Sequence, residues 1–391
     1  MNLVDGARVL VRSGLVRVEP PAVFFQTVRA SRRWDRTPAG AVAVNAVRHG
    51  NRVALIDEEG SLTHVELHER TNRLANSFAV DFGIGAGDRV GLLARDHRGF
   101  VEAMVALSKL GADVLLLNTS FSGPQLSETL AREGALALVH DAEFEAPDGV
   151  TSILADELVH GDDAREPDPP PEPGRQVLLT SGTTGKPKGA QRPPAPLGAI
   201  LGYLSRVPLR GREPLMVVSP MFHAWGFAHM GLGLLLGAPI VIRRRFDPEA
   251  TLAAIAAHRV PAVAVVPVMA QRIMELPAEV RARYDTSCLR VAVFGGSAIP
   301  GDLALRFMDA FGDVVYNAYG STEVALASVA SPADLRADPS TAGRLLPGIK
   351  VKLLDDSGQE VPRGSVGRIF VGGDAQFEGY TDGTGKAMAG G

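Results

Sequence analysis

The residues best suited to chemistry in this sequence form one loop at residues 180–189, TSGTTGKPKG. The loop follows the strand-like run Val177-Leu178-Leu179. Glycines allow a backbone to close around an anion, and Ser and Thr hydroxyl groups can donate hydrogen bonds to phosphate oxygens. Lys186 and Lys188 add positive charge. The sequence therefore predicts a phosphate-binding loop after a buried strand, rather than a flexible loop with two solvated lysines.

This loop does not match the phosphate loops of other enzyme classes. A Walker A loop requires a glycine, four residues and then Gly-Lys-Ser/Thr, and no glycine of the loop is followed by that pattern. The glycine-rich runs that begin at Gly83 and Gly231 lack the GxGxxG spacing of dinucleotide-binding folds. GGSAI at residues 295–299 lacks the last glycine of a hydrolase GxSxG elbow. The sequence therefore argues against a P-loop phosphotransferase and a serine hydrolase.

TSGTTGKPKG resembles the phosphate-loop signature of the adenylate-forming superfamily, which includes acyl-CoA synthetases, peptide-synthetase adenylation domains and luciferases. Four later segments resemble family motifs in the family's order. They are MFHAWG at residues 221–226, FGGS at 294–297, YGSTE at 319–323 and GSVG at 364–367. The resemblance covers residues 45–380, and it implies the large N-terminal domain of an acyl-CoA synthetase-like enzyme.

The resemblance also implies a role for each motif. Thr183 and Glu323 are expected to bind Mg²⁺, and Thr183, Lys188, His223 and Glu323 are the expected catalytic residues. ATP or AMP is expected to contact Thr180, Ser181, Gly182, Thr183, Thr184, Gly185, Lys188, Gly295, Gly296, Ser297, Asn317, Ala318, Tyr319, Gly320, Ser321 and Thr322. The acyl group is expected to contact His223, Phe227, Gly295, Gly296 and Ala318, with the two glycines leaving a path for the chain.

In this family a carboxylate attacks the α-phosphorus of ATP to give acyl-AMP and pyrophosphate, and the thiol of coenzyme A then attacks the acyl-AMP. Amino-acid-activating members usually place an aspartate near the acyl pocket, but MFHAWGFAHM at residues 221–230 contains no acidic residue. We therefore expect a fatty acyl or related non-amino carboxylic acid as substrate. Two alternatives stay open: an adenylate-binding module without complete catalysis, and a domain that loads a carrier-protein thiol.

Three further features of the sequence are not assigned a catalytic role. Arg243-Arg244-Arg245 either meets the acidic phosphates of coenzyme A or forms a solvated strand end. His229, one helical turn after Trp225, is expected to be structural. Cys288 has no nearby histidine, so a nucleophilic role is not expected.

The elements that must position these residues follow a βαβ pattern, which predicts parallel sheets covered by helices. Helices are expected at residues 65–78, 100–110, 248–258 and 302–311. Strands are expected at residues 52–56, 89–93, 112–117, 136–139, 176–179, 215–218, 239–242, 262–266, 290–294 and 313–317. The fold class is thus α/β, with two parallel-type α/β subdomains and a small antiparallel β module.

The domain boundaries come from changes in composition. An acidic, proline-rich connector at 161–176 separates expected subdomains at 1–160 and 176–342, and the antiparallel β module follows at 343–380. Residues 381–391 are expected to form a flexible tail at the approach to a hinge. Because only 11 residues follow Tyr380, the family's small C-terminal domain is expected to be absent from this chain.

Composition limits the remaining possibilities. The 391 residues include 40 Lys and Arg and 44 Asp and Glu, a formal net charge of −4, which argues against general nucleic-acid binding. The single cysteine excludes an internal disulfide and a multi-thiolate metal site. No signal peptide or bilayer-spanning segment is evident, so we expect a cytoplasmic protein with at most peripheral membrane contact. The N-terminal segment is expected to be a surface helix packed on its own domain rather than an interfacial helix.

Overall fold

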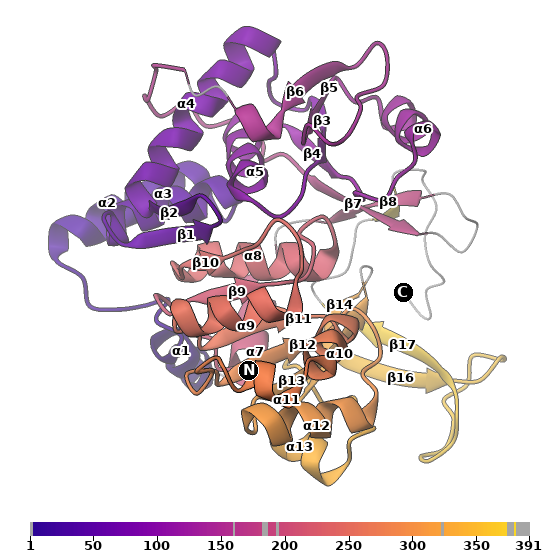
Figure 1. Cartoon of the computed structure of the whole chain (residues 1–391). Coiled ribbons are helices and arrows are strands. Elements are labelled where there is room, and N and C mark those ends of the chain that lie inside the picture. Colours follow the sequence, from indigo (N-terminus) through magenta and orange to yellow (C-terminus); the bar gives the residue numbers. More distant parts are fainter. Residues whose placement is uncertain are drawn as a thin grey trace.

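The computed structural model describes residues 3–158, 161–181, 187–192, 195–321, 324–373 and 379–380. The chain forms two sheets, one in each half of the molecule, and a two-stranded hairpin that projects from the lower half (Figure 1). This is the mixed α/β architecture with a small antiparallel module that the sequence predicts.

The upper half contains a seven-stranded sheet in the order β18-β8-β7-β4-β3-β5-β6. Its strands are β3 (Arg89–Leu93), β4 (Asp113–Leu116), β5 (Ala137–His140), β6 (Thr151–Leu154), β7 (Gln176–Ser181), β8 (Pro187–Arg192) and β18 (Gly379–Tyr380). Strands β7, β4, β3, β5 and β6 are parallel, whereas β8 and β18 are antiparallel additions at one edge.

Helices cover both faces of this sheet. Leu92 and Val114 pack with Phe100 and Met104 of α5 (Arg98–Leu110) in one buried cluster. The next residue on β4, Leu115, instead packs in a cluster with α6 (Gly123–Glu133). Successive side chains of a strand point to opposite faces, so α5 and α6 lie on opposite sides of the sheet.

The lower half contains a nine-stranded sheet in the order β15-β14-β13-β12-β11-β9-β10-β1-β2. Its strands are β1 (Val53–Asp57), β2 (Gly60–Thr63), β9 (Leu215–Val217), β10 (Ile240–Val241), β11 (Ala262–Val265), β12 (Val291–Phe294), β13 (Val315–Ser321), β14 (Ala325–Ala330) and β15 (Arg344–Leu345). Every residue of β11 and β12 is buried, as expected for central parallel strands covered on both faces. One face packs against α9 (Pro248–Ala257) and α12 (Gly301–Phe311), and the other packs against α8 (Ala224–Leu236).

The remaining elements complete the two layers. Helix α4 (His64–Phe82) begins with a capping box between Thr63 and Glu66 and ends at Gly83, which adopts the left-handed conformation that favours glycine. The other helices are α1 (Leu3–Arg12), α2 (Pro21–Trp34), α3 (Pro38–His49), the 3-10 turn η1 (Ala155–Glu157), α7 (Leu197–Arg206), α10 (Pro267–Glu275), α11 (Ala278–Arg281) and α13 (Pro332–Ala337). Among the described residues, no helix is long and apolar enough to cross a membrane.

The division between the sheets differs from the linear division expected at residues 161–176. Strands β1 and β2 come from the first part of the chain but join the nine-stranded sheet, because β1 pairs in parallel with β10. Strands β7 and β8 come after the connector but join the seven-stranded sheet through β4. One buried cluster also contains residues of both halves, including Leu92 and Leu215. The connector is therefore not the boundary between two separate cores.

The late module follows the prediction at its centre and departs from it at its ends. Strands β16 (Lys350–Leu354) and β17 (Arg368–Gly372) form the expected antiparallel pair. The flanking strand β15 instead pairs with β14 of the large sheet, and β18 pairs with β8 of the other sheet. The segment at 343–380 thus contacts both halves and is not one independent sheet.

Candidate functional site

The candidate site lies at the carboxyl ends of β11, β12 and β13. Gly295, Gly296 and Ser297 follow β12 directly, and Asn317 to Ser321 form the end of β13. The parallel pairing of Phe294 with Asn317 places these two segments beside each other. Ligands of open α/β sheets bind outside the carboxyl ends of their strands, so the fold brings the predicted glycine pair and the YGS segment to the expected edge.

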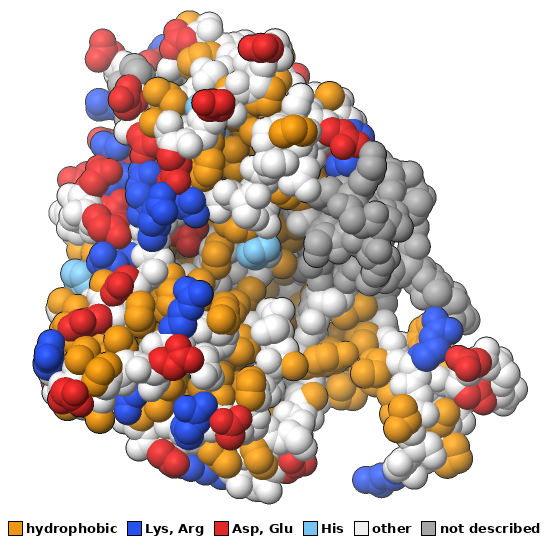
Figure 2. Space-filling model, turned by 45° about the vertical axis from the view of Figure 1, so that its right-hand side comes forward, with side chains coloured by type: hydrophobic (Ala, Val, Ile, Leu, Met, Phe, Trp, Pro, Cys, Tyr) orange, Lys and Arg blue, Asp and Glu red, His pale blue; other side chains and the backbone are white. Residues whose placement is uncertain are grey.

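Several residues at this edge are accessible to a ligand. Gly296 has φ +83°, a conformation that favours glycine, and both Gly296 and Ser297 are exposed. Tyr319 keeps 42% of its surface exposed, so its aromatic ring is available to stack on a base. Ala318 is buried in the hydrophobic core. Figure 2 shows that this side of the molecule is hollowed between the main body and a projecting lobe, with hydrophobic side chains along the hollow.

The segment before α8 carries the predicted histidine. His223 is the N-cap residue of α8, and its ring lies 4.3 Å from that of Phe222, measured between centroids. His223 is exposed, yet the surrounding protein removes enough water to lower the pKa of the imidazole. The side chain is therefore neutral near pH 7. Phe227, the other predicted acyl contact on α8, is partly buried against the core.

Trp225 belongs to the MFHAWG motif, but its part in the site is not predicted from the sequence. The indole Nε1 donates a hydrogen bond to the carbonyl oxygen of Val265 at the end of β11, over 3.2 Å. The ring packs against His229 at a centroid distance of 4.3 Å. A side chain built at Gly295 would place its Cβ 2.7 Å from the indole ring, well inside van der Waals contact. Gly295 therefore makes room for Trp225, whereas we expected it to leave a path for an acyl chain.

His229 holds Trp225 in this position, and its structural role is as expected. Its Nδ1 lies 2.9 Å from the carbonyl oxygen of Trp225, so Nδ1 carries the proton and donates to that oxygen. Its Nε2 then accepts a hydrogen bond from the Tyr203 hydroxyl group over 2.8 Å. Burial lowers the pKa of His229 to about 4, which keeps the ring neutral. Both nitrogen atoms are satisfied inside the core, as buried polar groups require.

A second relationship that the sequence did not reveal links the two halves of the molecule. Oδ1 of the Asp96 carboxyl group, in the loop between β3 and α5, accepts a hydrogen bond from the backbone N–H of Met221 over 2.8 Å. Burial raises the pKa of Asp96 to about 8. Met221 lies two residues before His223, so Asp96 fixes the start of the segment that carries the predicted site histidine.

The predicted phosphate loop is described only at its two ends. Thr180 and Ser181 lie in β7 and pair with Lys188 and Pro187 of β8. The other predicted ligands of this region lie outside the described residues, and they are Gly182, Thr183, Thr184, Gly185, Thr322 and Glu323. The proposed Mg²⁺ ligands Thr183 and Glu323 therefore stay predictions.

The Arg243-Arg244-Arg245 run is neither a solvated strand end nor a free cationic patch. Arg243 pairs with Glu58 over 3.5 Å, and Arg245 pairs with Glu143 over 2.7 Å. Arg244 donates to the carboxylates of both Asp141 and Asp156. The pairs of Arg244 and Arg245 connect the segment after β10 to the segments after β5 and β6 of the seven-stranded sheet, whereas Arg243 pairs with the β1–β2 turn of its own sheet.

The same pairs account for a group of potential metal ligands. One ligand atom each of His97, Asp141 and Asp156 lie within 4.8 Å of one another. The His97 Nε2–H donates to Asp141 over 2.8 Å, and Arg244 bonds both carboxylates. The Arg244 guanidinium therefore offsets part of the negative charge of this cluster, and both carboxylates already have a cationic partner.

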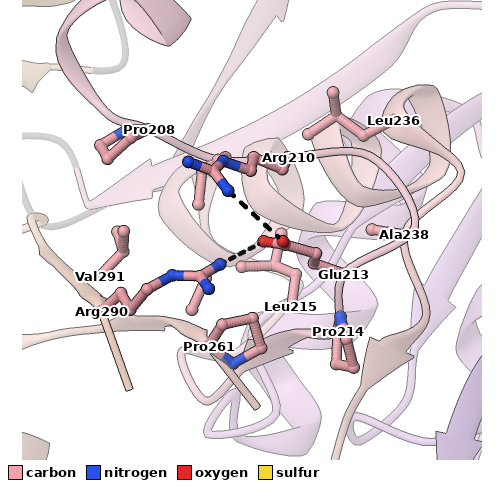
Figure 3. A pocket seen from close by; sticks show the side chains of 12 residues that line it. Pro208, Arg210, Glu213, Pro214, Leu215, Leu236, Ala238, Pro261, Arg290 and Val291 are labelled. Carbon is pink, nitrogen blue, oxygen red and sulfur yellow. Dashed lines mark hydrogen bonds and ion pairs between the residues drawn. The ribbon is translucent and has the colours of Figure 1, made fainter. Parts of the chain in front are cut away.

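A small cavity lies at the opposite ends of the strands from the candidate site. Leu215, Ala262 and Val291, the first residues of β9, β11 and β12, contribute to its wall. Glu213 lies between the guanidinium groups of Arg210 and Arg290 and bridges them (Figure 3). The cavity volume is about 10 Å³, enough for about one water molecule. It is too small for a substrate.

Comparison with known proteins agrees with this geometry. The family model described as AMP-binding enzyme matches residues 42–381. The chain belongs to this family. Feruloyl-CoA synthase from Amycolatopsis sp is 34% identical over 86% of this chain and 68% of its own length. Indoleacetate–CoA ligase from Aromatoleum aromaticum is 27% identical over 84% of this chain and 68% of its own length.

A solved structure confirms the fold of this AMP-binding enzyme. o-Succinylbenzoate CoA synthetase (MenE) from Bacillus subtilis, in complex with the acyl-adenylate intermediate OSB-AMP, aligns with a TM-score of 0.76 at 25% identity. The alignment covers 87% of this chain and 89% of that chain. The fold expected from the resemblance is thus the fold observed.

Proposed function

We propose that this protein activates a carboxylic acid with ATP, giving acyl-AMP and pyrophosphate, and transfers the acyl group to coenzyme A. The observation that carries the proposal is the meeting of the Gly295-Gly296-Ser297 and Asn317–Ser321 segments at the carboxyl ends of adjacent parallel strands. There an exposed Tyr319 ring suits an adenine base. Membership of the AMP-binding family supports the same reaction.

The chemistry requires two anions to meet. A carboxylate must approach the α-phosphorus of ATP, and the repulsion between them must be offset by hydrogen-bond donors and positive charge. Thr183, Thr184 and Lys188 would supply donors to the phosphates, and Thr183 and Glu323 would hold Mg²⁺, whose role is to neutralise phosphate charge. His223 is neutral and would border the substrate carboxylate without adding charge.

The substrate that fits the described residues best is a compact, flat acid rather than a long fatty acid. Trp225 fills the space in front of Gly295, and its hydrogen bond to Val265 and its contact with His229 keep it there. A long chain would have to displace this buried ring. The aromatic acids in the names of the feruloyl and indoleacetate relatives support a compact aromatic carboxylate.

Two alternatives share the first half of this reaction. A carrier-protein thiol could replace coenzyme A as the acceptor, and an adenylate-binding module would stop before turnover. We place the protein in the cytoplasm, where its single Cys288 would stay reduced.

Calorimetric titration tests the proposal. ATP, AMP and a non-hydrolysable cinnamoyl-AMP mimic are titrated into the chain, beside a pyrophosphate-release assay with ATP and cinnamate. We expect the mimic to bind more tightly than AMP, because it fills both subsites. Binding of the mimic without pyrophosphate release would favour the adenylate-binding module. A chain that binds neither AMP nor the mimic would contradict the proposal.

A further inference from the structure

Helix α2 presents an apolar and basic face to solvent. We define the outer α2 face as Phe24, Phe25, Val28, Arg29 and Arg32. These positions follow helical spacing, since Phe24 and Val28 are four residues apart and Phe25, Arg29 and Arg32 are separated by four and three. Phe24 is 55% exposed and Phe25 is 70% exposed. Two exposed aromatic rings on one helix are unusual for a surface that contacts only water.

The opposite face of α2 is fixed to the protein. Trp34 is buried, and its Nε1 donates to the Glu166 carboxylate over 2.7 Å. Arg33 pairs with the same carboxylate over 3.3 Å. These contacts tie α2 to the connector and fix its rotation. Phe24, Phe25 and Arg32 therefore point away from the body as a consequence of the fold. Arg29 lies at the border of the outer α2 face, where it also lines an open hollow with Arg33 and Glu166.

The charge around this face is opposite to that of the rest of the chain. The first 36 residues contain seven arginines and three acidic residues, a net charge of +4. The remainder then carries −8, because the whole chain carries −4. Among the described residues neither Arg29 nor Arg32 has an ion-pair partner, whereas the inward-facing Arg33 has one. The outer α2 face is thus a cationic surface whose two arginines are not paired with acidic side chains among the described residues.

Exposed apolar residues continue into the segment before α2. Val16 and Val18 are 51% and 102% exposed, and the exposed Arg17 lies between them. This region precedes residues 42–381, which match the family. The residues of this surface therefore lie outside the part of the chain that the family model matches.

We propose that the outer α2 face, with Val16 to Val18, binds the surface of an anionic lipid bilayer. Aromatic rings partition into the headgroup region while arginines contact lipid phosphates, and both groups are present here on one helix. A second copy of this chain is a poorer partner, because it would bring two positive faces together. A bilayer offers apolar depth and negative charge at once, so it complements the face in both respects.

Vesicle co-sedimentation tests this proposal with the whole chain. The probes are vesicles of phosphatidylcholine alone and of an equimolar mixture of phosphatidylcholine and phosphatidylglycerol. We expect binding to the anionic vesicles that weakens with salt, and much weaker binding to the neutral ones. Arg29→Glu/Arg32→Glu should weaken anionic binding at least about 20-fold, because each basic residue near such a surface contributes about 5-fold.

Matched variants show whether vesicle binding depends on the outer α2 face or on any exposed basic or apolar residue. Phe24→Ser/Phe25→Ser should also weaken binding at least about 10-fold, through lost apolar burial. Arg272→Glu and Val80→Ser change exposed residues on α10 and α4, and they should bind like the parent chain. Equal binding to both vesicle types, no binding to either, or parent-like binding of both double variants would overturn the proposal. A change in the oligomeric state of the lipid-free Phe24→Ser/Phe25→Ser chain would identify a protein interface and overturn it as well.

Discussion

The indole ring of Trp225 lies against the backbone of Gly295, so close that a Cβ at position 295 would be 2.7 Å from the ring. The two residues belong to different elements, α8 and the segment after β12, and are 70 positions apart in the sequence. The absence of a side chain at Gly295 is what allows the indole ring to lie there. Under the proposed function, this contact limits the depth available to an acyl group.

This contact predicts a specific loss of stability. Gly295→Ala should lower the free energy of unfolding by about 1–3 kcal/mol, because the new methyl group overlaps the indole ring. In a Trp225→Leu background the same change should cost clearly less, since the obstructing ring is gone. Urea unfolding of the four proteins of this cycle measures the coupling.

Gly231→Ala is the matched control. Gly231 lies within α8, and nothing lies within 4 Å of a Cβ built there. Alanine should stabilise the chain by about 0.4–1 kcal/mol at this position. If Gly295→Ala were as harmless as Gly231→Ala, the Trp225 ring would not lie where the structure places it.

Two neighbouring arginines should differ sharply in their contribution to stability. Arg244→Met leaves the fully buried Asp141 without its guanidinium partner, which should cost about 3–5 kcal/mol. Arg245→Met removes an ion pair whose arginine is 64% exposed, and it should cost less than about 1 kcal/mol. Thermal and urea unfolding measure both. If these arginines instead served to bind the phosphates of coenzyme A, either change would weaken coenzyme A binding and leave the free energy of unfolding unaltered.

Asp96 gives the protein a pH-dependent stability. Burial raises the pKa of its carboxyl group to about 8 in the folded chain, compared with about 3.9 in an unfolded chain. Folding therefore favours the protonated form, so this contribution is complete below about pH 4 and is lost as the pH rises towards 8. Asp96→Asn keeps an oxygen acceptor for the Met221 N–H and cannot ionise. The stability of the variant relative to the parent should increase between pH 4 and 8, by at most about 1.4 kcal/mol per pH unit.

Urea unfolding of both proteins across this pH range measures the difference. A constant difference in unfolding free energy from pH 4 to 8 would show that Asp96 ionises normally. The control is Asp355→Asn, because hydrogen bonds from Ser357 and Gln359 lower the pKa of the exposed Asp355. Its effect on stability should be confined to acidic pH.

The nucleotide side of the site is tested at Tyr319. Tyr319→Ala should weaken AMP binding about 5- to 100-fold, because stacking of a base on an aromatic ring is worth about 1–3 kcal/mol. Tyr284→Ala removes a tyrosine whose hydroxyl group donates to Glu249 in the first turn of α9, and it should leave AMP affinity unchanged. Calorimetry with both variants compares them directly. Equal AMP affinity of the Tyr319→Ala and parent chains would remove Tyr319 from the nucleotide site.

The metal prediction is tested at Glu323. Glu323→Ala should weaken Mg·ATP binding about 10- to 100-fold through loss of a charge-assisted contact, while binding of a metal-free acyl-AMP mimic should change far less. An equal loss for both ligands would indicate general damage to the fold instead of a lost metal ligand.

The sequence predicted the elements better than their assembly. Apolar runs and turn residues located β3 at residues 89–93 and placed β11 and β12 within one residue of their observed bounds, because buried parallel strands have strong local signals. The exchange of β1–β2 and β7–β8 between sheets depends on long-range pairing, of Leu55 with Ile240 and of Val114 with Gln176, which composition does not encode. The FGGS and YGSTE motifs pointed to Gly295 and Tyr319 as candidate site residues. The Trp225–Gly295 and Asp96–Met221 contacts join residues far apart in the sequence, and no local pattern predicts them.

The central claim is that Trp225 limits this AMP-binding enzyme to compact acids, and one titration series tests it most directly. Calorimetry compares non-hydrolysable cinnamoyl-AMP and palmitoyl-AMP mimics on the parent chain and on Trp225→Leu, with circular dichroism to confirm folding. We expect the parent to prefer the cinnamoyl mimic at least about 10-fold, the equivalent of about 1.4 kcal/mol for displacing a packed ring. Trp225→Leu should lose most of this preference while AMP affinity stays constant. A parent chain that binds the palmitoyl mimic as tightly as the cinnamoyl mimic would contradict the account.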